Sequence, residues 1–118
     1  MKSLVRIAIA LAATFATGQA LGEVVFELPA DAITSPPAMV CMTGSFNGWN
    51  TMAAPMAREG VVYRVHLNLA DGRHYYKFVW HDNKGETHWL NDPQRPYLAD
   101  NGICGANNVM DVENGETL

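Results

Sequence analysis

The stretch Val61-Val62-Tyr63-Arg64-Val65-His66-Leu67-Asn68-Leu69 alternates apolar and polar side chains along most of its length. Successive side chains of a β-strand point to opposite faces, so this period of two predicts a strand with one buried and one solvated face. Antiparallel sheets commonly show this pattern, because one face packs on the core and the other meets water. The stretch therefore favours an antiparallel β-sheet protein.

Short strands are also expected on both sides of this stretch, separated by residues typical of turns. Asp71-Gly72 predicts a tight turn, and Asp82-Asn83-Lys84-Gly85 predicts the closing turn of a hairpin. No segment shows convincing helical periodicity, so the pattern predicts an all-β antiparallel sandwich. The other expected strands cover residues 24–28, 39–43, 73–81, 86–90 and 108–112, and the longer loops cover residues 29–37 and 91–105.

The N-terminal segment has the layout of a secretory signal peptide. Lys2 and Arg6 form a positive start, an almost uninterrupted apolar run covers residues 7–15, and small residues follow it. We expect cleavage after Ala20 or Gly22, and export to a periplasm or to the extracellular space. The alternatives are a buried helix or a membrane anchor, but the run is shorter than the ~20 residues that cross a bilayer. After cleavage, nothing in the remaining chain is expected to span a membrane.

The length of 118 residues predicts a single domain behind this leader. The expected organisation is a signal peptide over residues 1–22, a strand with a Pro-containing loop over residues 23–37, a β-sandwich over residues 38–113 and a frayed tail over residues 114–118.

Net charge argues against two classes of partner. The chain has 8 Lys and Arg against 12 Asp and Glu, and loss of the two basic residues of the leader leaves 6 against 12, a net charge of −6. An acidic domain is a poor partner for nucleic acid or for an anionic membrane. A neutral ligand is compatible with this charge.

Cys41 and Cys104 are the two cysteines of the chain. Because an exported chain meets an oxidising compartment, we expect a disulfide between them. The bond would close a loop of roughly 60 residues and stabilise the fold by ~4 kcal/mol in the chain-entropy model. The alternative is two buried free thiols, because the sequence does not place the two Cβ atoms.

Two tryptophans lie in polar loops. Trp49 follows Gly48 in a turn, and Trp89 precedes the Asn91-Asp92-Pro93 corner. A tryptophan in a loop keeps a large apolar surface near water unless it packs or binds something. An indole can stack on the apolar face of a glucose ring, while Lys and Asn side chains supply hydrogen bonds to the hydroxyls. The pair is therefore a candidate sugar platform, and the alternative is a pair of lids on the hydrophobic core.

A series of short motifs follows one another between Met39 and Val112. The motifs are Gly44-Ser45-Phe46-Asn47-Gly48-Trp49, Pro55-Met56-Ala57-Arg58, Leu69-Ala70-Asp71-Gly72, Tyr76-Lys77-Phe78, Trp89-Leu90-Asn91-Asp92-Pro93 and Asn107-Asn108-Val109. In this order they resemble the glycogen-binding domain of the AMP-activated kinase beta subunit, a member of carbohydrate-binding module family 48. The resemblance implies an immunoglobulin-like, early-set β-sandwich that binds α-glucans.

The resemblance also implies roles for individual residues. Trp49 and Trp89 match the family's two sugar-stacking tryptophans, Lys77 matches its ligand lysine and Asn107 matches its ligand asparagine. Ile103 matches an apolar residue that cradles the sugar, provided that the loop aligns without a gap.

The chain departs from the kinase pattern in three respects. A family threonine falls on Gly105, which removes one hydroxyl contact, and the loop over residues 81–88 is longer, which re-aims Trp89. Cys41 and Cys104 are not part of the kinase pattern and suit an extracytoplasmic version of the module.

The alternation of side chains around Lys77 predicts which residues share each face of this strand. Tyr76 and Phe78 share one face, and Tyr75, Lys77 and Val79 share the other. If the first face packs inward, Lys77 points outward across the sheet. The alternative is an ordinary solvated strand lysine.

We therefore predict an exported, non-catalytic module that binds α-glucans such as glycogen, starch or maltooligosaccharides, with no cofactor. The alternative is an early-set structural or protein-interaction domain, accessory to a glucan-active enzyme, that binds no sugar itself. No acidic pair in a cleft is recognisable for glycoside hydrolysis. No metal site is expected either: His81, Asp82, Glu86 and His88 cluster in one hairpin, which is typical of a solvated hairpin tip.

Overall fold

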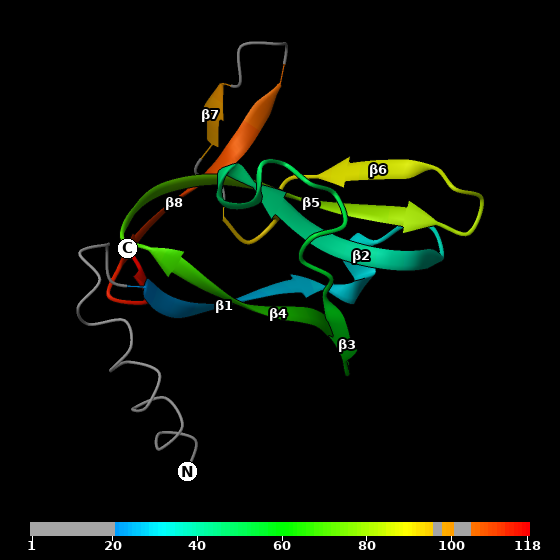
Figure 1. Cartoon of the computed structure of the whole chain (residues 1–118). Helices are drawn as coiled ribbons and strands as arrows, with labels where there is room; N and C mark the ends of the chain where they lie inside the picture. Colours follow the sequence, from blue (N-terminus) through cyan, green and yellow to red (C-terminus); the bar gives the residue numbers. More distant parts are fainter. Residues whose placement is uncertain (1–20, 96–97, 101–104) are drawn as a thin grey trace.

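The computed structural model describes residues 21–95, 98–100 and 105–118, which form two antiparallel sheets (Figure 1). The smaller sheet has the order β1 (Leu21–Pro29), β4 (Val62–Ala70), β3 (Ala57–Glu59). The larger has the order β2 (Pro37–Gly44), β5 (Gly72–Asp82), β8 (Ala106–Glu113), β7 (Leu98–Asp100), with β6 (Thr87–Leu90) paired to β5 and β9 (Glu116–Thr117) paired to β8. Two short 3-10 helices, η1 (Ala30–Ala32) and η2 (Ser45–Asn47), follow β1 and β2.

The predicted all-β antiparallel sandwich is confirmed, and each expected strand is present with slightly different ends. Three further strands, β3, β7 and β9, were not predicted. β7 lies within the expected loop over residues 91–105, and β9 lies within the tail that was expected to fray. Each is only two or three residues long, so its own side chains cannot show a period of two, and pairing to a neighbouring strand defines it. None of the helices among the described residues has the length and apolar character that crossing a membrane requires.

The core lies between the inner faces of the two sheets. Phe26 of β1 contacts Tyr76 of β5 with ring centroids 5.5 Å apart, and Tyr76 meets Phe78 edge-on at 5.8 Å. Leu69 and Tyr63 of β4 are buried, while the alternate residues of that strand are more open to solvent. The predicted alternation in this strand is therefore confirmed, and apolar burial of this kind supplies most of the driving force for folding.

The turn after β2 depends on close approach between two backbones. A Cβ atom at Gly44 would lie 2.2 Å from the carbonyl oxygen of Tyr75 and 2.5 Å from Cε2 of Phe46. Only glycine lets β2 end this close to β5, because the obstructing carbonyl belongs to the sheet and cannot swing away. Gly44 thereby fixes where the following turn, which contains Trp49, leaves the sheet.

Gly44→Ala is expected to destabilise the fold by ~1–3 kcal/mol, the usual range for an overpacked site. This corresponds to a fall in melting temperature of at least ~4 °C for a domain of this size. Gly60→Asn is the matched control, because nothing lies within 4 Å of a Cβ atom there and Asn tolerates its φ of +65°. Equal melting temperatures for wild-type and Gly44→Ala protein would contradict the close-approach argument.

Candidate functional site

The face of the larger sheet turned away from the core, here called the outer face, carries Lys77 and Trp89. Tyr76 and Phe78 are fully buried in the core, so Lys77 between them points outward, as predicted. The Lys77 ammonium donates a hydrogen bond of 3.0 Å to the Ala106 carbonyl, which ties it to the start of β8. Trp89 lies opposite Val79 of β5 and is 48% exposed.

Asn107 lies on β8 beside Lys77. The register of β5 and β8 pairs Tyr75 with Val109 and Tyr76 with Asn108, so Asn107 comes next opposite Lys77. Its half-buried side chain makes no hydrogen bond to another described residue. Two polar groups, one a donor and one both donor and acceptor, therefore lie side by side on the outer face.

Trp49 is held in a tight turn directly after η2. Gly48 and Trp49 both have left-handed backbone conformations, with φ of 66° and 61°. The Trp49 N–H donates to the Gly44 carbonyl at 2.9 Å, while the Asn47 side chain accepts from the Gly44 N–H at 3.1 Å. A tryptophan in this region of the backbone is strained, and such strain is concentrated at functional sites.

His81 connects the segments that carry the two tryptophans. Its Nε2 lies 3.1 Å from the Thr51 carbonyl and its Nδ1 lies 3.1 Å from Oγ1 of Thr87. Because a carbonyl only accepts, Nε2 carries the proton, and in the neutral ring Nδ1 accepts from the Thr87 hydroxyl. Thr51 is two residues after Trp49, and Thr87 is two residues before Trp89. His81 thus holds the loop after Trp49 against the strand that carries Trp89.

The corner after Trp89 is fastened to the interior by buried polar side chains. Oδ1 of Asn108 accepts from the Asp92 N–H at 2.7 Å and from the Asn91 amide at 3.0 Å. The Tyr76 hydroxyl donates to the Asp92 carboxylate at 2.7 Å, and burial, together with this bond, raises the pKa of Tyr76 well above its usual range. Tyr76 is therefore a neutral donor at physiological pH, and the corner cannot shift without breaking buried hydrogen bonds.

Two of these supporting residues were not identified from the sequence. His81 was considered only as a metal ligand, and Asn108 only as part of the Asn-Asn motif. The distances that reveal their roles join residues far apart in the chain, for which sequence spacing carries no signal. Ile103 lies outside the described residues, so its role stays a prediction, and Gly105 is exposed.

The disulfide between Cys41 and Cys104 also stays a prediction. Cys41 is fully buried on β2 and is a free thiol in this structure, and burial raises its pKa. Cys104 lies outside the described residues.

In the hairpin between β5 and β6, ligand atoms of Asp82, Glu86 and His88 all lie within 4.8 Å of one another. Asp82 accepts hydrogen bonds from the backbone N–H groups of Lys84 and Glu86, both at 2.9 Å, and from His88 at 2.8 Å. The His88 ring in turn stacks on Trp80, with centroids 4.7 Å apart. These contacts indicate that Asp82 organises the hairpin turn, and we assign no metal to the cluster.

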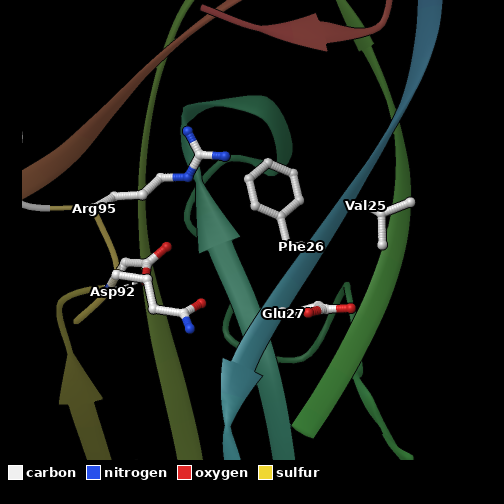
Figure 2. Close-up of a pocket in the computed structure, with 6 residues that line it drawn as sticks. Val25, Phe26, Glu27, Asp92 and Arg95 are labelled. Atoms are coloured by element: carbon white, nitrogen blue, oxygen red, sulfur yellow. Dashed lines mark hydrogen bonds between the residues drawn. The ribbon is translucent and has the colours of Figure 1, made fainter.

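Two hollows lined by described residues lie away from the outer face. Figure 2 shows one of about 250 Å³ between β1 and the corner, where Phe26 and Arg95 reach toward each other. Its two acidic groups already have partners, because Asp92 accepts from Tyr76 and Glu27 accepts from Arg64, and Arg95 donates to Thr117. A second hollow of similar size is lined by Ala30, residues 33–37, Arg58 and Tyr63. Neither hollow is lined by Trp49, Lys77, Trp89 or Asn107.

Comparison with known proteins gives a family match. Residues 35–117 match the family model described as the glycogen recognition site of AMP-activated protein kinase. This range begins shortly before β2 and includes both tryptophans, Lys77 and Asn107.

Individual relatives are similar over the same region. Protein FLOURY ENDOSPERM 6, chloroplastic, of Oryza sativa subsp. japonica is 33% identical over 79 residues, which are 67% of this chain and 14% of the relative. Protein PTST homolog 2, chloroplastic, of Arabidopsis thaliana is 32% identical over 71 residues, 60% of this chain and 12% of the relative. The human 5'-AMP-activated protein kinase subunit beta-1 is 30% identical over 74 residues, 63% of this chain and 24% of the relative. The chain thus spans only a small part of these relatives.

His81→Leu is expected to loosen the loop after Trp49 by removing the hydrogen bond to Thr51. A single such bond contributes about 1 kcal/mol, so amide hydrogen exchange over residues 48–53 should rise about fivefold. His81→Gln keeps hydrogen-bonding atoms at this position and should restore part of the protection. Unchanged exchange in a folded His81→Leu protein would show that His81 does not hold the loop.

Asp82 is expected to make the hairpin sensitive to acid. The hydrogen bond from His88, followed by the one from the Glu86 N–H, lowers the pKa of Asp82 below the value of about 3.9 for an unperturbed Asp. Its contribution to stability is therefore present above about pH 4 and is lost as the pH falls through the folded-state pKa. Thermal melts of wild-type and Asp82→Asn protein should show a wild-type advantage at pH 7 that shrinks below about pH 4. An advantage that is the same at pH 2.5 and pH 7 would contradict this role, and Asp31→Asn, at an exposed carboxylate, is the control.

Proposed function

Since this chain belongs to the family of the glycogen recognition site of AMP-activated protein kinase, we propose that it binds α-glucans on the outer face. Trp49 and Trp89 supply stacking platforms, and Lys77 and Asn107 supply hydrogen bonds to sugar hydroxyls. The immunoglobulin-like, early-set type of sandwich belongs to the same proposal.

The observation that carries the proposal is the position of the tryptophans relative to the core. Among the described residues, the partly buried apolar side chains that pack against the core include the neighbours Phe46 and Leu90, but neither Trp49 nor Trp89. This argues against lids on the core between the two sheets, whereas Val79, opposite Trp89, is buried on the outer face itself. An exposed indole beside Lys77 and Asn107 suits a ligand with one apolar and several polar edges, as a glucose ring has.

The position of the candidate residues on a sheet face favours a chain-like ligand over a small molecule. Small-molecule sites are usually concave and enclose most of their ligand, whereas the outer face presents side chains on a sheet. Stacking on one aromatic residue contributes ~1–3 kcal/mol by analogy with nucleic-acid bases, so single-chain affinity should lie in the micromolar to millimolar range. Repeated sites on a polymer raise the effective affinity.

The wider biological setting is also proposed. The leader-like pattern of residues 1–22 supports export to a periplasm or outside the cell, and the family match supports a glucan-associated, non-catalytic role. A glucan-active partner enzyme is part of the same proposal. The competing proposal, an interaction domain that binds no sugar, predicts that the outer face contacts protein.

Trp49→Ala and Trp89→Ala are each expected to lower the affinity for maltoheptaose about tenfold or more, because each removes one stacking platform. Lys77→Ala and Asn107→Ala should have smaller effects, since water partly replaces a polar contact. Isothermal titration calorimetry measures affinity, and thermal melts of the same samples show whether the fold is intact.

Val61→Ala is the control for these variants, because Val61 is 79% exposed on the turn between β3 and β4. Retention of the wild-type protein on amylose or glycogen, but not on cellulose, would support the proposal. No heat with maltoheptaose and no retention on amylose would instead favour the interaction domain.

A further inference from the structure

Tyr75 is an exposed aromatic residue on the outer face that the resemblance assigns no role. It precedes Lys77 by two residues on β5 and therefore shares its face, and it is 36% exposed. Its hydroxyl makes no hydrogen bond to another described residue. A tyrosine ring in this position offers a flat apolar face with a polar tip to whatever lies on the sheet.

The backbone of Tyr75 is held by the same turn that holds Trp49. Oγ of Ser45 accepts a hydrogen bond of 3.0 Å from the Tyr75 N–H, at the point where β2 no longer pairs with β5. Gly44, whose carbonyl accepts from the Trp49 N–H, packs against the Tyr75 carbonyl. Tyr75 is thus positioned at the base of the Trp49 turn, on a rigid part of the sheet.

Tyr75 and Trp89 lie on opposite sides of the polar side chains of Lys77 and Asn107. Val79, the partner of Trp89, is four residues after Tyr75, which corresponds to about 14 Å along a strand. Lys77 lies midway between them, with Asn107 opposite it. Arg73 lies two residues before Tyr75 on β5 and on the same face. Its guanidinium donates two hydrogen bonds, of 2.8 and 2.9 Å, to the Asp111 carboxylate, and this ion pair ends the row of side chains.

We propose that Tyr75 is a further stacking platform, and that the outer face takes a linear α-glucan chain of several rings laid along β5. The chain runs from Trp89 past Lys77 and Asn107 to Tyr75, with an aromatic side chain at each end and polar groups between. This inference rests on the proposed function and adds the direction and minimum length of the ligand. A chain too short to reach Tyr75 gains nothing from it.

The test compares ligands of two lengths. Tyr75→Thr removes the ring but keeps a residue suited to strands, and Tyr75→Phe keeps the ring. Titration calorimetry with maltose and maltoheptaose gives the affinities, with Val25→Ala as the control, because Val25 is 44% exposed on the smaller sheet. We expect Tyr75→Thr to weaken binding of maltoheptaose about fivefold or more and that of maltose less than twofold, with Tyr75→Phe close to wild type.

Each outcome bears on a separate claim. If Trp89→Ala loses maltoheptaose binding while Tyr75→Thr binds both ligands as the wild type does, the Tyr75 platform is wrong and the proposed function stands. Equal loss for both lengths would overturn the chain direction, because Tyr75 would then lie within the short-chain site. Absence of binding by the wild-type protein would overturn both proposals. Matching thermal melts for all variants are required for each comparison, and Tyr75→Val, which also removes the ring and suits a strand, replaces Tyr75→Thr if that variant does not fold.

Discussion

The buried hydrogen bonds of Asn108 determine how the parts of the outer face are placed relative to one another. Its side chain is fully buried, and its oxygen receives the Asp92 N–H and the Asn91 amide while its nitrogen donates to the Arg95 carbonyl. A buried polar group without a partner is costly, so these bonds must form together or not at all. The corner that follows Trp89 is consequently fixed to the strand that carries Asn107, and the Tyr76 hydroxyl fixes the same corner to β5.

The segments of the candidate site fix the local geometry of the sheet and also present the aromatic side chains. Gly44 and Ser45 end β2 against the backbone of Tyr75, and the same turn presents Trp49. His81 joins the loop after Trp49 to β6. The aromatic side chains thus project from a sheet and an adjoining turn whose local geometry is set by hydrogen bonds. This arrangement suits weak, repeated binding to a polymer, in which a rigid surface loses little conformational entropy with each contact.

Most of the fold and part of the site could be predicted from the sequence. The period of two in residues 61–69 and 73–81 reports local geometry directly, so the long strands and the outward direction of Lys77 follow from it. β7 and β9 could not be found this way, because pairing with β8 alone defines them. The same limit applies to His81 and Asn108, whose roles depend on partners many residues away. Family resemblance identified the tryptophans, but only the structure shows that neither packs against the core between the two sheets.

The left-handed backbone conformation of Trp49 affects which substitutions this surface can accept. A residue with a Cβ atom is disfavoured there by roughly 1–2 kcal/mol relative to glycine, so the backbone conformation taken alone favours glycine. Gly or Asn at this position would relieve that strain but would remove a half-buried indole from the proposed ligand surface. Backbone strain and ligand recognition therefore act in opposite directions at a single residue. In a version of this module that no longer needed to bind its ligand, we expect substitutions to accumulate first at Trp49, while the rest of the fold stays intact.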